Sequence, residues 1–367
     1  MISDTLEITR LLTRKTNLGD TRLEVSRESP LALGEAVLKL NRFSVTTNNI
    51  TYAAFGESMG YWNFFPTGQA DWGHMPVWGF ADVLASRTPS IETGERLFGY
   101  FPIASHLRVQ PIKITPGGFT DGATHRQGLP GVYNQYPRCS ADPAYSRELE
   151  DFQALYRPLF ITSYTLVDFL RDNDWFGAKR AVISSASSKT AYGAAFCLKD
   201  SGLALIGLTS ARNSAFVERL GCYQSTVEYK ALEGIVSDVP TIYLDFSGDE
   251  ALRARIHRHF ASALVHNCFA GSTQNPHFLR QLDLPGPIPK FFFAAQQLDK
   301  YTAAGQMKTF LNRFDEAQKA FFQLVSKEAS PWIVVVEREG FAAASEVIAN
   351  LSSGLSNPEE GNIIYLT

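Results

Sequence analysis

Cysteine is scarce in this chain of 367 residues, with four copies placed far apart, at positions 139, 197, 222 and 268. A disulfide framework or a structural zinc site needs paired or closely spaced cysteines. Histidine is scattered too, apart from His257 and His259. Side chains two positions apart on a helix point to different faces, so this pair does not converge on a metal. The sequence therefore predicts no bound metal.

Long apolar runs and an excess of basic charge are also missing. No run approaches the roughly 20 residues that span a bilayer, and the N-terminal segment lacks the apolar centre of a signal peptide. The formal net charge of −3 gives no positive field that would attract nucleic acid. We therefore expect a cytoplasmic protein that binds neither a membrane nor nucleic acid.

Familiar catalytic motifs are absent as well. The sequence contains no P-loop and no His-Glu-x-x-His. Phosphate-cleaving and metalloprotease functions therefore lose support.

What the chain does contain is two regions of different pattern. The first 115 or so residues carry short apolar runs cut by Gly, Pro and Asn, which predicts a β-rich unit. A long irregular stretch follows over residues 115–145. Beyond it, apolar strands near 181–185, 203–210 and 240–248 alternate with helix-length segments. This alternation predicts an α/β domain with a doubly wound parallel sheet.

Residues 181–229 resemble the cofactor-binding segment of zinc-independent medium-chain reductases, the group of zeta-crystallin-like quinone and enoyl reductases. The resemblance is carried by ISSASSKTAYGAAFCLK, LALIGLTSARNSAFVERLG and, further on, YLDFSGDEAL. Upstream, GERLFGY and VTTNNITYAAFG are similar to the family's turn and substrate-cleft segments. LPGVYNQY and PKFFFAAQQ are similar to an uncharacterised bacterial branch of the superfamily.

The resemblance implies a GroES-like substrate domain over residues 1–145, completed by residues 290–367. It implies a Rossmann domain that binds NADPH over residues 146–289. It also implies a possible homodimer, for which the apolar stretch from Leu264 to Ser272 is a candidate edge. Zinc-dependent members carry Cys near the position of Thr47 and a His-Glu pair in the turn matched by Trp78, Gly79 and Phe80, and neither is present.

The phosphate-binding turn departs from the family, because Ser188 and Ala191 stand where glycine is usual and Gly193 comes late. Small hydroxyl-bearing residues and one lysine replace the glycines and are the predicted diphosphate ligands: Ser185, Ser187, Ser188, Lys189 and Thr190. The alternative is a Rossmann-like domain that has lost its nucleotide.

The tip of the second strand of this domain favours NADPH over NADH. It carries no carboxylate for a ribose hydroxyl, and Ser210, Arg212 and Asn213 could instead hold a 2′-phosphate. The alternative is an exposed polar loop that caps a helix. Thr165 matches a family threonine near the nicotinamide carboxamide. Phe246, Ser247 and Gly248 follow the third strand and are expected near the nicotinamide ribose.

The predicted catalytic residues are tyrosines and an asparagine. Tyr52 and Asn49 lie in the segment similar to the substrate cleft, and a tyrosine there can bind a carbonyl oxygen or deliver a proton. Tyr133 and Tyr136, with Asn134 and His125 nearby, are the second set. For each tyrosine the alternative is a packed ring whose hydroxyl is bonded to the backbone.

These features predict an NADPH-dependent oxidoreductase that reduces an activated double bond or a quinone-like carbonyl of a small-molecule substrate. Two alternatives stay open: a non-catalytic protein on the reductase scaffold that binds NADPH or a partner, and a lyase or isomerase that uses the same cleft. Fold resemblance alone does not decide among them.

Overall fold

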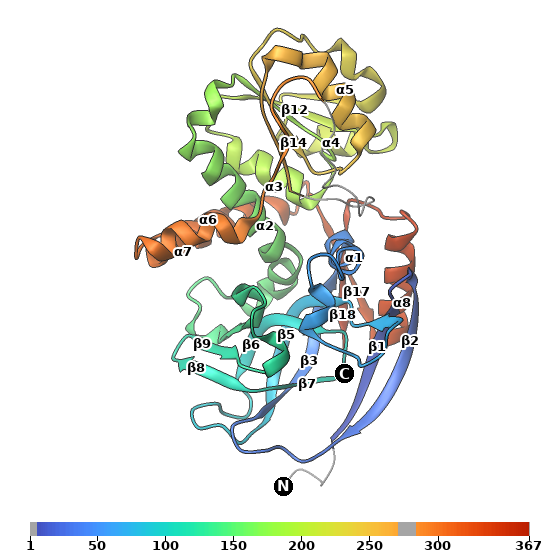
Figure 1. The fold of residues 1–367 in the computed structure, drawn as a ribbon, viewed down its shortest axis with the longest axis vertical. Helices are drawn as coiled ribbons and strands as arrows, with labels where there is room; N and C mark the ends of the chain where they lie inside the picture. The colour runs from blue at the N-terminus through green and yellow to red at the C-terminus, as the bar shows by residue number, and fades with distance from the viewer. Residues whose placement is uncertain (1–5, 271–283, 367) are drawn as a thin grey trace. The chain divides into compact units, whose positions relative to one another are not determined.

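The computed structural model describes residues 6–270 and 284–366 (Figure 1). The chain divides into two compact units, of which unit 1 is Met1–Leu155 with Val334–Thr367 and unit 2 is Tyr156–Ile333. The first boundary therefore follows Leu155 rather than residue 145. Residues 290–333, which we expected to complete the first domain, belong to unit 2.

Unit 1 is β-rich, as predicted, and most of its strands pair antiparallel. Its strands form a six-stranded sheet in the order β17-β18-β3-β5-β6, with β7 on β3, and two three-stranded sheets, β2-β1-β4 and β10-β9-β8. The strand bounds are β1 (Leu6–Arg14), β2 (Asn17–Glu28), β3 (Ala36–Val45), β4 (Trp72–Gly73), β5 (Pro76–Ser86), β6 (Arg96–Pro102), β7 (His106–Val109), β8 (Pro111–Thr115), β9 (Gly118–Asp121), β10 (Gln135–Pro137), β17 (Val334–Glu339) and β18 (Glu360–Tyr365).

The core of unit 1 is built from the inward faces of these strands and from two helices, α1 (Thr47–Ala54) and α8 (Gly340–Ser352). Alternate residues of β3, such as Leu38 and Leu40, are buried because successive side chains of a strand point to opposite faces. Helix α8 lies alongside β2 (Figure 1) and buries Ala344, Val347 and Ile348. The C-terminal segment of the chain thus completes the core of unit 1.

Helix α2 (Glu150–Asp172) begins in unit 1 and carries a proline in its interior, Pro158. Proline has no N–H, so the carbonyl of Ala154, four residues earlier, loses its helical partner. The hydroxyl of Ser44 donates to that carbonyl instead, at 2.8 Å. A buried carbonyl left unsatisfied would cost about 1–3 kcal/mol, so Ser44 makes the proline tolerable.

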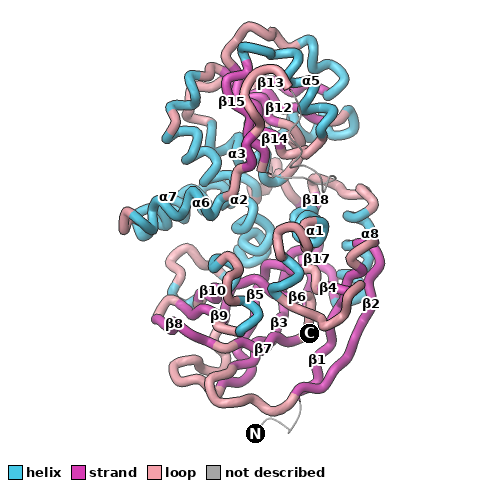
Figure 2. The backbone as a smooth tube through the Cα atoms, in the orientation of Figure 1, coloured by secondary structure: helices cyan, strands magenta, loops and turns pink. Residues whose placement is uncertain are grey.

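Unit 2 contains the predicted parallel sheet, with helices packed around it (Figure 2). The six strands run in the order β13-β12-β11-β14-β15-β16, and all their pairings are parallel. Their bounds are β11 (Arg180–Ile183), β12 (Ala204–Thr209), β13 (Ser225–Glu228), β14 (Thr241–Asp245), β15 (Leu264–Phe269) and β16 (Lys290–Phe291). The helices are α3 (Lys189–Leu198), α4 (Ser214–Leu220), α5 (Glu250–Phe260), α6 (Ala294–Ala303) and α7 (Met307–Val325).

Both faces of this sheet are covered, which explains its nearly continuous apolar strands. Ala181 and Ile183 of β11 pack in a cluster with residues of α2 and α3. Val182, between them, packs in the opposite cluster with residues of α5. The described part of the predicted dimer edge, residues 264–270, contains β15, which pairs with both β14 and β16 and is therefore not an edge strand of this sheet. The rest of that stretch, Gly271 and Ser272, lies outside the described residues.

Helices α6 and α7 belong to unit 2 because aromatic side chains of α7 pack on α2. The rings of Phe160 and Phe321 stack with centroids 4.6 Å apart, and Phe314 lies 5.8 Å from Phe160. On α6, Lys300 and Tyr301 bind the carboxylate of Asp168 of α2. Within the described ranges, no helix is long and apolar enough to cross a bilayer.

Candidate functional site

The strand order of unit 2 places a topological switch point between β11 and β14. From β11 the chain continues to β12 on one side and later returns to β14 on the other. Ligands of doubly wound sheets bind at the carboxyl ends of the strands beside such a point. Most of the predicted cofactor residues follow β11, β12 and β14, so the fold brings these turns to one edge of the sheet.

The turn after β11 is held in an unusual backbone conformation. Ser185 has φ 49°, in the left-handed region that glycine adopts without strain. Two tyrosines from the segment around β13 fix it: Tyr229 Oη accepts a hydrogen bond from the Ser185 N–H at 3.0 Å, and Tyr223 Oη donates to the Ala186 carbonyl at 3.0 Å. Side-chain contacts thus replace the missing glycines in shaping the turn.

Helix α3 begins directly after this turn. Ser188 is its N-cap, and its hydroxyl accepts from the N–H of Ala191 at 3.3 Å. Lys189 and Thr190 are therefore first-turn residues, beside the positive end of the helix dipole. Gly193 lies where an added Cβ would stand 2.8 Å from Ser163 Oγ, so glycine lets α3 approach α2. The late glycine serves helix packing.

The turn after β12 lies beside the turn after β11. Ser210 precedes a short 3-10 helix, η7 (Ala211–Asn213), that contains Arg212, and the side chain of Asn213 donates to Ser187 Oγ at 3.1 Å. This hydrogen bond joins the two predicted phosphate-binding segments. The segments combine hydroxyls, a lysine, an arginine and a helix N-terminus, and this set of donors fits a diphosphate and a 2′-phosphate.

The turn after β14 carries Phe246, Ser247 and Gly248, and it is tied to the end of β11. The N–H groups of Phe246 and Ser247 donate to Ser184 Oγ at 3.1 and 3.3 Å. The carboxylate of Asp245 accepts from Ser184 Oγ at 3.0 Å and forms a buried ion pair with Arg253. Sequence reasoning noticed Asp245 only as part of a strand motif, and it missed Ser184 and Arg253.

In unit 1, a capped helix positions the predicted catalytic tyrosine. Thr46 caps α1, and the Asn49 side chain accepts from the Thr46 N–H at 2.7 Å to complete a capping box. The Asn49 amide also donates to the Pro76 carbonyl at 2.9 Å. Both polar atoms of Asn49 therefore hold α1 and β5, and Tyr52, one turn later, is buried on the same face of the helix.

Tyr52 belongs to a set of aromatic side chains that we call the tyrosine cluster: Tyr52, Tyr61, Trp78, Tyr100 and Tyr133. Its rings pack directly on one another, with centroids 4.7 Å apart for Tyr100–Tyr133 and 4.8 Å for Tyr52–Tyr61. Tyr100 is fully buried, whereas Tyr52 and Tyr61 keep 7% and Tyr133 keeps 9% of their surface exposed. Among the four tyrosines of the cluster, these three keep some exposed surface.

The hydroxyls of the cluster are linked to one another. Tyr61 and Tyr133 share a hydrogen bond at 3.3 Å, and Trp78 Nε1 donates to Tyr52 Oη at 3.3 Å. Burial raises the pKa of Tyr52 above its usual 10.0, although hydrogen bonds from Trp78, Asn48 and Tyr133 partly offset the effect. Burial likewise raises the pKa of Tyr61 and of Tyr133. All three are neutral phenols at physiological pH and so can donate a hydrogen bond or a proton.

Three other residues singled out from the sequence belong neither to the turns of unit 2 nor to the tyrosine cluster. Tyr136 is fully buried in the core of unit 1, where its hydroxyl donates to the Tyr100 carbonyl at 2.8 Å and accepts from Arg126 at 3.1 Å. Burial raises its pKa to about 12. Thr165 lies inside α2 of unit 2, with its hydroxyl bonded to the Ile161 carbonyl. His125 is exposed in a short 3-10 helix, η2 (Thr124–Arg126).

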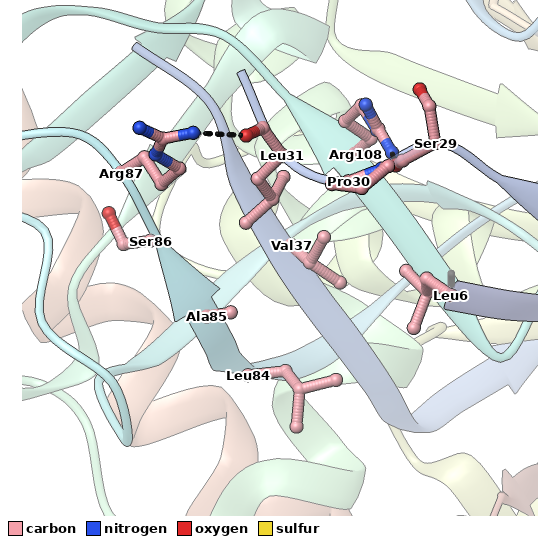
Figure 3. Close-up of a pocket in the computed structure, with 10 residues that line it drawn as sticks. All are labelled: Leu6, Ser29, Pro30, Leu31, Val37, Leu84, Ala85, Ser86, Arg87 and Arg108. Carbon is pink, nitrogen blue, oxygen red and sulfur yellow. Dashed lines mark hydrogen bonds between the residues drawn. The ribbon is translucent and has the colours of Figure 1, made fainter. Parts of the chain in front are cut away.

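A pocket of about 260 Å³ lies elsewhere in unit 1 (Figure 3). Its arginines are bonded to the chain itself, Arg87 to the Leu31 carbonyl and Arg108 to Glu35. At about 3.3 Å per residue, Ala85 in its wall lies roughly 20 Å along β5 from Trp78. The pocket is therefore separate from the tyrosine cluster.

Comparison with protein families identifies the chain over most of its length. A family model described as "Protein of unknown function (DUF2855)" matches residues 43–356. The chain belongs to the DUF2855 family. No curated protein matches it.

Solved structures resemble this DUF2855 protein over its whole length. CurA from Vibrio vulnificus, also solved with NADPH, has a TM-score of 0.60 at 12% identity, covering 98% of this chain and 99% of its own. A protein described as an NADPH:quinone reductase from Mesorhizobium loti has a TM-score of 0.59 at 13% identity, covering 100% and 99%. The yhdH oxidoreductase from Salmonella enterica, solved with NADP, reaches 0.52 at 12% identity, covering 98% and 100%.

These likenesses show the fold. The DUF2855 chain has the fold of the medium-chain reductases, in which antiparallel β-rich sheets accompany a parallel six-stranded sheet. The resemblance stated from the sequence is thereby confirmed.

Proposed function

We propose that this protein is an NADPH-dependent reductase that acts without zinc on an activated C=C bond or a quinone-like carbonyl of a small molecule. The observation that carries the proposal is the Asn213–Ser187 hydrogen bond. It joins two hydroxyl-rich turns at the carboxyl edge of a parallel sheet, beside the N-terminus of a helix. Structures that share the fold contain NADPH or NADP.

Each half of the proposed phosphate site has its own chemistry. The first turn of α3, with Ser188, Lys189 and Thr190, would hold the diphosphate through amides, hydroxyls and a positive charge. Arg212 and Ser210 would hold the 2′-phosphate, because a guanidinium matches phosphate oxygens in geometry as well as charge. When bound, NADPH supplies the hydride.

The tyrosine cluster supplies the chemistry that we assign to unit 1. As hydride adds to the β-carbon of an enone, the C=C electron pair shifts and negative charge develops on the carbonyl oxygen. The neutral hydroxyl of Tyr52 would donate a hydrogen bond to that oxygen, with Tyr133 beside it. A proton from tyrosine or water then completes the reduction. The raised pKa of Tyr52 suits this role, because the phenol keeps its proton until charge develops.

The first test is calorimetric titration of the purified chain with NADPH and with NADH. NADPH binding at least tenfold tighter than NADH binding is the expected result, since a 2′-phosphate held by arginine contributes about 1.4 kcal/mol or more. Binding of neither nucleotide to the folded protein would overturn the proposal. Enones and quinones would then be screened for NADPH oxidation.

Two further outcomes separate the alternatives. NADPH binding without oxidation by any acceptor would favour a non-catalytic binding protein, and conversion of an enone or acyl compound without NADPH consumption would favour a lyase or isomerase. We also propose a homodimer, to be tested by gel filtration with light scattering. A monomer at micromolar concentration would count against it.

A further inference from the structure

A buried carboxylate organises the end of β14. Asp245 is fully buried, and its Oδ1 accepts hydrogen bonds from Ser184 Oγ at 3.0 Å and Ser247 Oγ at 2.8 Å. The same oxygen accepts from the N–H groups of Ser247 at 3.0 Å and Gly248 at 3.1 Å. Two backbone amides and two hydroxyls therefore converge on one oxygen, which fixes the turn after β14.

The other carboxylate oxygen is neutralised from helix α5. Arg253 donates from Nε to Asp245 Oδ2 at 2.9 Å, and its Nη2 lies 2.8 Å from the same oxygen. The guanidinium also lies over the ring of Phe269, at the end of β15, 4.7 Å from its centroid. An unpaired carboxylate at this edge would repel a phosphorylated ligand, so the ion pair makes an anion tolerable there.

Ser184 links the ends of β11 and β14, on the two sides of the switch point, by hydrogen bonds. It follows β11, is fully buried, donates to Asp245 and accepts from the turn after β14. Its hydroxyl is thus the bridge between the two strand ends beside which a dinucleotide binds. The diphosphate and adenosine lie on the side of β11 and β12 in such folds, which leaves the turn after β14 to the other nucleotide half.

We propose that Ser184, Asp245 and Arg253 are positioning residues that hold the turn Phe246–Gly248 in the shape that receives the nicotinamide half of the cofactor. The inference rests on the proposed function. It adds that binding of the nicotinamide half depends on this trio, whereas binding of the adenosine phosphate half does not.

Removing the charge of Asp245 or of Arg253 would be a poor test, because breaking a buried ion pair endangers folding. Ser184→Ala removes the bridging hydroxyl alone, and Ser184→Thr keeps it. The matched control is Thr241→Val at the amino end of β14, where a fully buried hydroxyl accepts from Arg180 Nε at 3.0 Å and Nη2 at 2.7 Å. This control also loses buried hydrogen bonds, but at the opposite edge of the sheet.

The readout compares two ligands by calorimetry: NADPH, and adenosine 2′,5′-bisphosphate, which lacks the nicotinamide half. For Ser184→Ala we expect the Kd for NADPH to rise about tenfold, the effect of one lost hydrogen-bonded contact, while the Kd for the bisphosphate stays within about twofold. Ser184→Thr should recover NADPH binding. Thr241→Val should lower the melting temperature without changing either Kd.

The outcomes are distinguishable. If the wild-type chain binds neither ligand, the proposed function fails. If the wild type binds both and Ser184→Ala weakens both equally, or neither, the trio has only a structural role and this inference is overturned. An equal loss of NADPH binding in Thr241→Val would overturn it as well.

Discussion

The phosphate-binding turns of unit 2 and the tyrosine cluster of unit 1 both gather hydroxyl groups, yet they are built in opposite ways. The hydroxyl groups of the turns come from short runs of consecutive residues, and Ser187 and Ser188 are half-buried at the start of a helix. The cluster takes its hydroxyls from separate segments, and its tyrosines pack together so closely that each keeps at most 9% of its surface exposed.

The difference follows from what each region would bind. A phosphate keeps its charge and much of its hydration, so donors at a wet sheet edge and the end of a helix dipole suffice. Charge on a substrate oxygen appears only during reaction, and a donor acts on it most strongly in a low-dielectric environment. Hydroxyls embedded among aromatic rings meet that condition.

The largest expected effect concerns the cluster. Tyr52→Phe should lower kcat for NADPH-dependent enone reduction about a hundredfold, the usual cost of losing one donor to a developing oxyanion. It should leave the Kd for NADPH unchanged, because Tyr52 belongs to unit 1 and the nucleotide is assigned to unit 2. Steady-state kinetics and calorimetry measure both quantities.

The matched control is Tyr100→Phe in the same cluster. Its ring packs on Tyr133, but it is fully buried and away from solvent, so kcat should change less than threefold. Equal losses in the two variants would mean that packing of the cluster matters rather than the Tyr52 hydroxyl.

The same contrast explains how much the sequence could predict. The strands of unit 2 and the turns after them were found because each is a local pattern of consecutive residues, and the structure has β11, β12 and β14 where strands were expected. Tyr61 and Tyr100 were missed, because nothing local to either ring indicates that it will meet Tyr52. Only folding of the β-rich unit brings those segments together.

Other contacts between distant segments could not be predicted from the sequence for the same reason. The resemblance assigned residues 290–367 to the first domain, whereas α7 belongs to unit 2, where Phe321 stacks on Phe160. Arg253 and Asp245 are separated by a turn and part of a helix, so their pairing depends on how α5 leaves the sheet. The Asn49 amide was assigned to substrate from its segment, yet it is bonded to the backbone of the chain.

The second largest expected effect is on NADPH affinity, and it tests the phosphate-binding turns of unit 2. Arg212→Glu should raise the Kd for NADPH by about tenfold or more and leave the Kd for NADH within about twofold, because only NADPH carries the phosphate that the arginine would meet. Arg258→Glu is the control with the same charge change. It lies in the last turn of α5, at the other end of that helix from the carboxyl edge of β14. Equal changes for both nucleotides in Arg212→Glu would remove Arg212 from the 2′-phosphate site.

A smaller effect concerns the left-handed residue in the turn after β11. Ser185→Gly should change the free energy of unfolding by less than about 1 kcal/mol, because glycine adopts φ 49° without strain but gains freedom in the unfolded chain. Ser185→Val should cost about 2 kcal/mol, since a β-branched residue is strained there. Urea denaturation of the two variants compares them directly. Equal stability of the two would show that the turn relaxes and is not held by Tyr229 and Tyr223.

The smallest effects are those of pH, and the two regions should differ even here. Tyr52 has its pKa raised above 10.0 by burial, so its neutral form persists as pH rises, and kcat should stay flat between pH 7 and about 9.

A phosphate monoester has its second pKa near 6, so the 2′-phosphate loses charge as pH falls below that value. The preference for NADPH over NADH should therefore shrink a few-fold between pH 7.5 and about 5.5, and Arg212→Glu should abolish that change. Calorimetry with both nucleotides at the two pH values tests the turns, and a pH–rate profile tests the cluster. A fall in kcat between pH 7 and 9 would mean that a neutral acid is lost in that range, which the buried phenol of Tyr52 does not allow, and the proton donor would then have to be sought outside the cluster.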